Sequence, residues 1–323
     1  MIQRPRRNRK SQVIRDFVSE TQLGIQNLIF PLFLIKGSNQ KIEVKSMPGI
    51  YRYSPDQLRE EIKECLDLGL KSFVLFPSID DSLKDKVASE GENPAGLYIS
   101  TIRMLKDAYP EICIMTDVAM DPYSSDGHDG LVEDGKIVND KTLPILGRMA
   151  LLQAKAGADI IGPSDMMDGR VGYIRKVLDQ AGYSEVSIMS YTAKYASAFY
   201  GPFRDALDSA PKAGDKKTYQ MDPANRQEAL REAELDIAEG ADMLMVKPAL
   251  SYLDVIKSLK ENFTVPIAAY NVSGEYAMLK AATERGWLEE DKVMQEVLLS
   301  IRRAGASVIL TYFAKSFAQL VNG

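Results

Sequence analysis

Apolar runs of strand length recur along the whole chain. Most of them are continuous rather than alternating with polar residues, a pattern typical of strands that are covered on both faces. Eight such runs predict strands at residues 28–34, 72–77, 112–118, 159–163, 186–193, 243–247, 266–272 and 307–313.

Segments with helical periodicity separate these strands. A Gly-Ala-Asp or Gly-Ala-Ser triplet at 157–159, 240–242 and 305–307 marks the end of a helix and the start of a strand, since glycine favours the position just after a helix C-terminus. Helices with clear patterns are predicted at 54–70, 142–156, 170–181, 223–239, 252–261, 276–285 and 289–304.

Eight strands, each followed by a helix, predict an α/β protein with a closed (β/α)8 barrel. An open, doubly wound sheet is the alternative, but no G-x-G-x-x-G motif follows the first strand. No Pro/Ser-rich linker divides the 323 residues, so one barrel domain is expected at 26–323, preceded by an extended N-terminal arm at 1–25.

Composition narrows the class of protein. No apolar run approaches the ~20 residues of a membrane helix, and no apolar stretch follows the basic N-terminus as it would in a secretory signal. The two cysteines form no C-x-x-C pair, which indicates a reduced, cytoplasmic protein. A net charge of −5 argues against a nucleic-acid partner.

Two lysines, Lys194 and Lys247, stand at the ends of two consecutive apolar strands. A single strand-end lysine is usually a surface residue that keeps its charge in water. Two on adjacent barrel strands would face one pocket, where burial and mutual repulsion both favour loss of a proton. Because a neutral lysine is a nucleophile toward carbonyls, the pair predicts an enzyme that binds two carbonyl substrates as Schiff bases.

Further polar residues follow the C-terminal ends of the other strands, where barrel enzymes carry their chemistry. Asp117 follows the third strand, Ser164 and Asp165 the fourth, Ser273 the seventh, and Tyr312 lies near the end of the eighth. Asp117 and Asp165 are candidates for proton transfer, because the single histidine of the chain, His128, cannot supply repeated acid–base steps alone. A lone histidine is more often structural.

Longer motifs around both lysines resemble those of one family. SYTAKYASAFYGPFRDA at 190–206 and MLMVKPA at 243–249 are similar to the signatures of the porphobilinogen synthases, also called 5-aminolaevulinate dehydratases. IGPSDMMDGRV at 161–171 and YNVSGEY at 270–276 agree, and the resemblance covers essentially the full chain. It implies condensation of two 5-aminolaevulinate molecules to porphobilinogen, with loss of two waters, in tetrapyrrole biosynthesis and without an organic cofactor.

The resemblance also implies roles for single residues. Lys247 matches the lysine that binds the first substrate and Lys194 the one that binds the second. Ser273 and Tyr312 match the groups that hold the first substrate's carboxylate, and Arg204, Lys216 and Gln220 match those around the second substrate's carboxylate. Ser164 and Tyr200 are also expected to bind substrate. Ser273 could instead be a helix N-cap, and Tyr312 could be a core residue.

Residues 195–221 form a long connection with room for only a short helix. Such a segment is usually functional or disordered, so a floppy surface insertion is the alternative to an active-site lid. A lid is favoured here, because its closure would bring cations over a substrate carboxylate and exclude water from the imines.

Metal binding is predicted from the positions at which zinc-dependent relatives carry three cysteines. Ala119, Asp121 and Asp129 stand there, so no catalytic zinc is expected and the chain resembles the aspartate-rich, magnesium-activated type. Asp121 and Asp129 could bind a hard cation or hydrogen-bond the second substrate's amine. Glu232 matches the ligand of an allosteric Mg²⁺, although residues 231–236 taken alone indicate a solvated helix face.

The arm at 1–25 is implied by the resemblance to embrace a neighbouring barrel and to build a homo-octamer. Its arginines at 4–9 would pair with acidic surface on the neighbour. A disordered tail and RNA binding are the alternatives for this basic segment.

Two other functions stay open at this stage. A Schiff-base aldolase of sugar phosphates needs one lysine and a phosphate site after the seventh and eighth strands. A non-catalytic barrel that binds a small molecule needs neither lysine as a nucleophile. The sequence does not fix which cation activates the enzyme or which bond between the substrates forms first.

Overall fold

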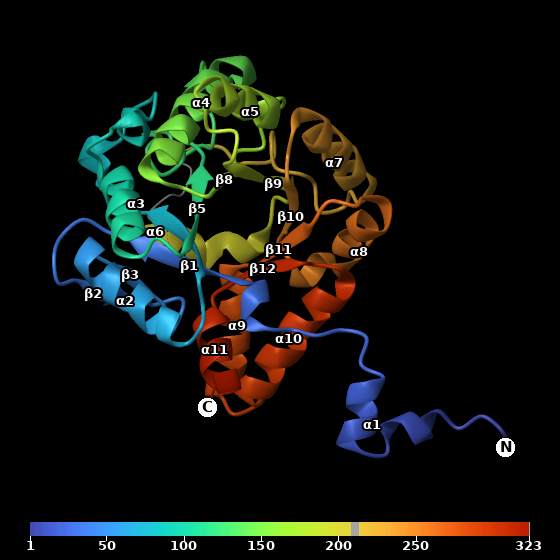
Figure 1. Cartoon of the computed structure of the whole chain (residues 1–323). Helices are drawn as coiled ribbons and strands as arrows, with labels where there is room; N and C mark the ends of the chain where they lie inside the picture. The colour runs from blue at the N-terminus through green and yellow to red at the C-terminus, as the bar shows by residue number, and fades with distance from the viewer. Residues whose placement is uncertain (208–212, 323) are drawn as a thin grey trace.

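The computed structural model describes residues 1–207 and 213–322. Eight parallel strands follow one another around a barrel, and β12 pairs back with β1 through Leu28–Ile309 and Ile29–Leu310 (Figure 1). This closure confirms the predicted (β/α)8, or TIM, barrel. Its strands are β1 (Leu28–Leu34), β4 (Ser72–Pro77), β5 (Cys113–Val118), β8 (Ile160–Pro163), β9 (Ser187–Lys194), β10 (Met243–Lys247), β11 (Ile267–Asn271) and β12 (Val308–Thr311).

Helices form a ring around the strands (Figure 1). Gly157, Gly240 and Gly305 end three of them with φ of 106°, 101° and 126°, a region that glycine reaches without strain, as the triplets predicted. The ring consists of α2 (Pro55–Asp67), α3 (Leu97–Ala108), α4 (Asn139–Ala156), α5 (Arg170–Gln180), α7 (Gln227–Glu239), α8 (Leu253–Asn262), α9 (Ser273–Glu284), α10 (Glu290–Ala304) and α11 (Ala314–Asn322).

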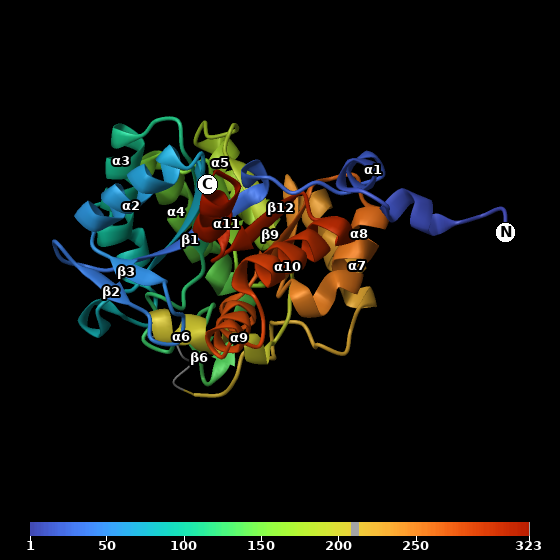
Figure 2. The ribbon, with the colours of Figure 1, turned by 90° about the horizontal axis from the view of Figure 1, so that it is seen from below.

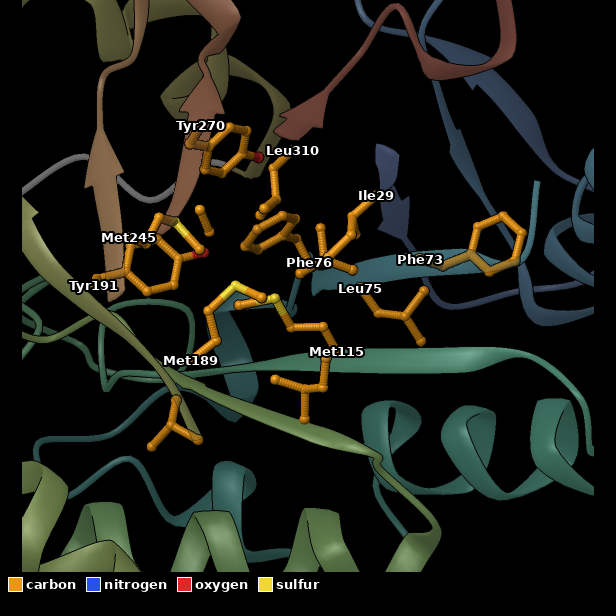
Figure 3. Close-up of a cluster of buried hydrophobic side chains, with 14 of the residues drawn as sticks. Ile29, Phe73, Leu75, Phe76, Met115, Met189, Tyr191, Met245, Tyr270 and Leu310 are labelled. Carbon is orange, nitrogen blue, oxygen red and sulfur yellow. The ribbon is translucent and has the colours of Figure 1, made fainter. Parts of the chain in front are cut away.

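Side chains fill the interior of the barrel. Met115 and Met189 point toward each other between their strands, with Phe76 beside them (Figure 3). All three side chains are buried, so the barrel is a packed core and not a channel. A substrate can therefore enter only at an end, and the polar residues that follow the strands lie at the C-terminal end.

A bulge in β9 decides where Lys194 points. Leu244 pairs with Ser190 and Val246 with Ala193, so three steps along β9 match two along β10. Tyr191 faces the interior (Figure 3), and in a regular strand a residue three positions later would face the helices. The extra residue turns Lys194 back toward the interior and pairs it directly with Lys247.

Several elements depart from the sequence prediction. The short strands β2 (Lys41–Glu43) and β3 (Tyr51–Tyr53) form a hairpin beside β1, and β6 (Val132–Glu133) pairs with β7 (Lys136–Ile137). Helix α7 begins at Gln227 and not at 223, because Asp222 Oδ1 accepts a hydrogen bond from the Ala224 amide (2.9 Å) and forms a turn. Helix α9 begins three residues earlier than predicted.

The N-terminal arm, with η1 (Pro5–Arg9) and α1 (Gln12–Phe17), lies away from the barrel (Figures 1 and 2). Its apolar side chains Val13 and Phe17 are 61% and 79% exposed. In the described ranges, no helix is both long and apolar enough to cross a membrane.

Candidate active site

Lys247 lies in an aromatic cage at the end of β10. Its Nζ is 4.7–5.2 Å from the ring centres of four residues, and its side chain is largely buried. Burial and, after it, the positive charge of Lys194 together lower the pKa of Lys247 to about 7. A large neutral fraction therefore exists near neutral pH. The four rings belong to Tyr191, Tyr200, Phe203 and Tyr270.

Lys194 has a different environment, because its Nζ is hydrogen-bonded. It donates to Asp129 Oδ2 at 3.0 Å and to the carbonyl oxygen of Ser164. Asp129 is fully buried and also accepts a hydrogen bond from Lys216. Burial alone would raise the pKa of Asp129, but the two lysines hold it at about 2, so the carboxylate is ionised.

Three more carboxyl groups line this end of the barrel. Burial, together with the charge of Asp121, raises the pKa of Asp117 to about 7, although Lys194 opposes the shift. Burial raises the pKa of Asp165 to about 6 against the charge of Arg170, and burial also raises the pKa of Asp121. Asp117 and Asp165 can therefore exchange protons near neutral pH.

The first part of the predicted lid places two aromatic rings next to Lys247. It contains η5 (Ala198–Tyr200) and α6 (Gly201–Leu207), which lies beside α9 (Figure 2). The ring of Phe203 enters the barrel mouth and meets Phe76 edge-on, with 5.0 Å between ring centres. The Phe203 amide donates to Ser273 Oγ (3.0 Å), and the Tyr200 hydroxyl donates to the Lys247 carbonyl oxygen (3.1 Å).

The second part of the predicted lid closes over Lys194. Lys216 Nζ lies 3.2 Å from Asp121 Oδ2. His128 Nε2 donates to the Ala213 carbonyl oxygen (2.9 Å), which can only accept, and its Nδ1 lies 3.0 Å from the Tyr219 hydroxyl. Residues 208–212 of the predicted lid lie outside the described residues.

The remaining predicted substrate-binding residues lie around the same end. Ser273 is the first residue of α9 and not its N-cap, which is Val272. Tyr312 is buried, and its hydroxyl is 3.0 Å from that of Tyr270. Gln220 is buried in the lid segment, and Arg204 is half-buried on α6.

Sequence reasoning missed three of the rings around Lys247. Tyr191, Phe203 and Tyr270 all lie in the motifs that carried the family resemblance. Nothing in an apolar pattern separates an aromatic residue that faces a pocket from one that fills a core. The one feature that could have pointed to these three rings is their proximity in sequence to Lys194 and Ser273.

Comparison with known proteins identifies the family. The model of the family described as delta-aminolevulinic acid dehydratase matches residues 2–320. The chain belongs to the delta-aminolevulinic acid dehydratase family. Members of this family are lyases of porphyrin biosynthesis.

Named dehydratases of this family are similar over nearly the full chain. The chloroplastic delta-aminolevulinic acid dehydratase of Physcomitrium patens is 58% identical over 99% of this chain and 74% of its own. The enzyme of Bradyrhizobium diazoefficiens is 55% identical over 98% of this chain and 90% of its own. The solved porphobilinogen synthase of Toxoplasma gondii, in complex with the reaction product porphobilinogen, has a TM-score of 0.97 at 52% identity and covers 99% of this chain and 92% of its own.

A second cavity of this dehydratase lies outside the lysine pocket. It has a volume of about 930 Å³ and is lined by residues that include Glu232, Glu228, Asp168 and His128. Burial raises the pKa of Glu232, as do the nearby acidic groups, while Arg170 opposes the shift. The half-buried carboxylate therefore faces both the cationic Arg170 and several acidic groups.

The expectation of a solvated helix face at 231–236 is wrong for Asp236. That residue is only 2% exposed, and its Oδ2 accepts a hydrogen bond from Ser190 Oγ (2.7 Å). Its Oδ1 lies 3.5 Å from Arg170 Nη1. The helical pattern could not reveal this, because both partners come from elements distant in sequence. Asp236 is thus engaged with Ser190 and Arg170 in the core.

Proposed function

We propose that this chain condenses two molecules of 5-aminolaevulinate to porphobilinogen, with loss of two waters, through Schiff bases on Lys247 and Lys194. The observation that carries the proposal is the direct pairing of the two lysines at the ends of β9 and β10. Both are largely buried in one pocket, and the family identity supplies the substrate.

Lys247 is proposed to react first, because it is the lysine with a substantial neutral fraction and, within the described residues, no carboxylate pairs with it. Its nitrogen adds to the C4 ketone, and the resulting carbinolamine loses water to give an imine. The aromatic cage excludes bulk water, which would hydrolyse that imine. Ser273 and Tyr312 would turn from their present partners to the substrate carboxylate.

Lys194 must transfer its proton before it can attack the second ketone, since it is ion-paired with Asp129. Its imine forms with loss of the second water. Removal of a C3 proton gives an enamine, which attacks the first imine carbon, while the first substrate's amine adds to the second imine carbon. This addition closes the ring, and expulsion of both lysines, with loss of the second C3 proton and of one C5 proton of the first substrate, gives the aromatic pyrrole. Asp117 and Asp165 are proposed to carry the protons.

The rate of the first Schiff base should depend on pH through Lys247. Its pKa of about 7 lies below the ordinary 10.5, and the neutral amine is the reactive form. We expect the rate to rise about tenfold per pH unit below 7 and to level off above it. Rapid-quench borohydride trapping on Lys247 between pH 5.5 and 9 measures this. A rise that continues to pH 10 would contradict a depressed pKa.

The segment 195–221 is proposed to act as a lid, with Lys216, Arg204 and Gln220 reaching the second substrate's carboxylate. The hydrogen bonds of Ala213 and Tyr219 to His128, and the ion pairs of Lys216, support this, because they tie the segment to the loop that carries Asp121 and Asp129. Asp121 is already ion-paired with Lys216, and Asp129 with both Lys194 and Lys216. We therefore propose that these two carboxylates bind the lysines or the amine of the second substrate, and that they do not bind a metal cation.

Glu232 is proposed to hold an activating Mg²⁺. Mg²⁺ keeps several of its waters and binds proteins through one or two carboxylates, which fits a single half-buried glutamate beside Glu228 and Asp168 in a roomy cavity. The ion would supply positive charge next to the Glu232 carboxylate.

Replacing Glu232 by alanine is expected to abolish the stimulation of activity by Mg²⁺ while leaving the basal rate within about twofold. Glu234→Ala is the matched control, because Glu234 is exposed on the same helix two residues later. Rates measured across a Mg²⁺ titration test this. Equal stimulation of the two variants would place the ion elsewhere.

The arm is proposed to join subunits into a homo-octamer, which would cover the apolar Val13 and Phe17 now exposed. We also propose that the enzyme works in the cytoplasm. Free thiols at Cys65 and Cys113 agree with a reducing compartment.

The overall function is tested by incubating the purified protein with 5-aminolaevulinate and Mg²⁺ and measuring porphobilinogen by its coloured product with an aldehyde reagent. A variant with both lysines replaced by methionine is the blank. We expect porphobilinogen from the wild type alone. A folded wild-type protein that forms no porphobilinogen would contradict the proposal.

A further inference from the structure

A buried carboxylate lies beside the Lys247 pocket and takes no part in the chemistry proposed above. Glu275, in the first turn of α9, is fully buried. Its Oε1 accepts a hydrogen bond from the Leu250 amide at 2.8 Å. Its Oε2 accepts from Asn271 Nδ2 at 2.9 Å and from the Val272 amide at 3.1 Å.

The hydrogen bonds continue from Asn271 to the next strand. Asn271 Oδ1 accepts from Thr311 Oγ1 at 2.9 Å, and Thr311 Oγ1 accepts from the Phe313 amide at 3.2 Å. One unbroken relay therefore runs from the loop after β10, across the end of β11, to the end of β12. All three of its side chains are buried.

Each backbone segment that the relay holds adjoins one group of the first-substrate site. Leu250 follows Lys247 by three positions, Val272 immediately precedes Ser273, and Phe313 immediately follows Tyr312. Lys194 ends β9, and none of these segments belongs to that strand. The relay thus joins the backbone on one side of the pocket only.

The polarity of the relay is fixed by backbone amides, which can only donate. The Phe313 amide donates to Thr311 Oγ1, so the Thr311 hydroxyl donates to Asn271 Oδ1 and the Asn271 nitrogen turns to Glu275, whose oxygens also accept from the Leu250 and Val272 amides. Burial raises the pKa of Glu275 to about 7, with the hydrogen bonds opposing the shift. An apolar residue at this position would avoid the cost of burying the carboxylate, but it would leave the Leu250 and Val272 amides unpaired.

We propose that Glu275, acting through Asn271 and Thr311, is a positioning residue that aligns Lys247, Ser273 and Tyr312 for the first substrate. This inference rests on the proposed function of those three groups. A shift of about 1 Å in such groups can cost on the order of 100-fold in rate, so the relay governs the first site without touching substrate.

The experiment compares borohydride trapping of 5-aminolaevulinate on the Lys247 peptide in the wild type and in the variants Glu275→Gln, Thr311→Val and Thr311→Ser. The glutamine would bring an NH₂ group against donors, and the valine removes the hydroxyl that the serine keeps. Glu61→Gln is the matched control, because Glu61 is a buried carboxylate on α2, 3.3 Å from Lys41 Nζ and 2.6 Å from Lys315 Nζ. Thermal melting is recorded for each protein.

Glu275→Gln and Thr311→Val are expected to raise the substrate concentration for half-maximal trapping on Lys247 at least about tenfold. Thr311→Ser and Glu61→Gln should stay near the wild-type concentration, even where Glu61→Gln melts as early as Glu275→Gln. If Thr311→Val traps like Thr311→Ser, or Glu275→Gln like Glu61→Gln, the relay has no positioning role. Should Glu275→Gln not fold, the Thr311 pair decides. A wild type that is not trapped on Lys247 refutes the proposed function instead.

Discussion

Replacing Lys247 by methionine is expected to lower porphobilinogen formation by about 10⁴-fold or more, because the first covalent intermediate can no longer form. The same change should not destabilise the protein. Methionine has a similar length, and the aromatic cage of Tyr191, Tyr200 and Tyr270 is apolar enough to hold it.

The stability of the Lys247→Met variant provides the control for this loss. The folded-state pKa of Lys247 is about 7 and the ordinary value is 10.5, so the unfolded chain binds more protons between these pH values. The contribution of Lys247 to the free energy of unfolding should therefore increase as the pH rises from about 7 to 10.5. The Lys247→Met variant should lack this increase. Melting temperatures at pH 7.5 and 9.5 measure it. An active or grossly unfolded variant would contradict the assignment.

Replacing Lys194 by methionine should also lower porphobilinogen formation by about 10⁴-fold. Unlike the Lys247 change, it should also destabilise the protein. Asp129 is ionised and fully buried, and it would keep only Lys216 as an ionic partner. Breaking a buried pair costs on the order of 3 to 5 kcal/mol. Unfolding by denaturant should show this loss, and Lys247 should still be trapped with substrate.

A double variant separates the two effects of this change. Lys194→Met with Asp129→Asn removes the carboxylate that has lost one of its two lysines, so we expect part of the stability to return while porphobilinogen formation stays absent. A Schiff-base aldolase with one essential lysine would survive the Lys194 change. Retained carbon–carbon bond chemistry in Lys194→Met would therefore favour that alternative over a two-lysine condensation.

The barrel was predictable because its strands are continuous apolar runs. The boundaries of β1, β4 and β10 agree with the predicted ranges, since buried strands bounded by turn residues leave little freedom. Helix starts at α7 and α9 were placed wrongly, because the side chains of Asp222 and Glu275 set them. Side-chain to backbone hydrogen bonds of this kind are weakly encoded in periodicity.

The positions of the two lysines were predictable, but their environments were not. The bulge between Ser190 and Ala193, which turns Lys194 inward, leaves no mark in a run of apolar residues. The contrast between a caged Lys247 and an ion-paired Lys194 depends on Phe203 and Asp129, which reach the pocket from other parts of the chain. Long-range contacts of this kind follow from the closed barrel and not from any local pattern.

The most direct test of the two-lysine site is reduction of the wild-type enzyme with borohydride in the presence of 5-aminolaevulinate, followed by mass spectrometry of its peptides. We expect a reduced substrate adduct on the peptide with Lys247 and a second on the peptide with Lys194. An enzyme that makes porphobilinogen at its full rate yet carries an adduct on neither lysine, or on only one under every condition, would contradict it.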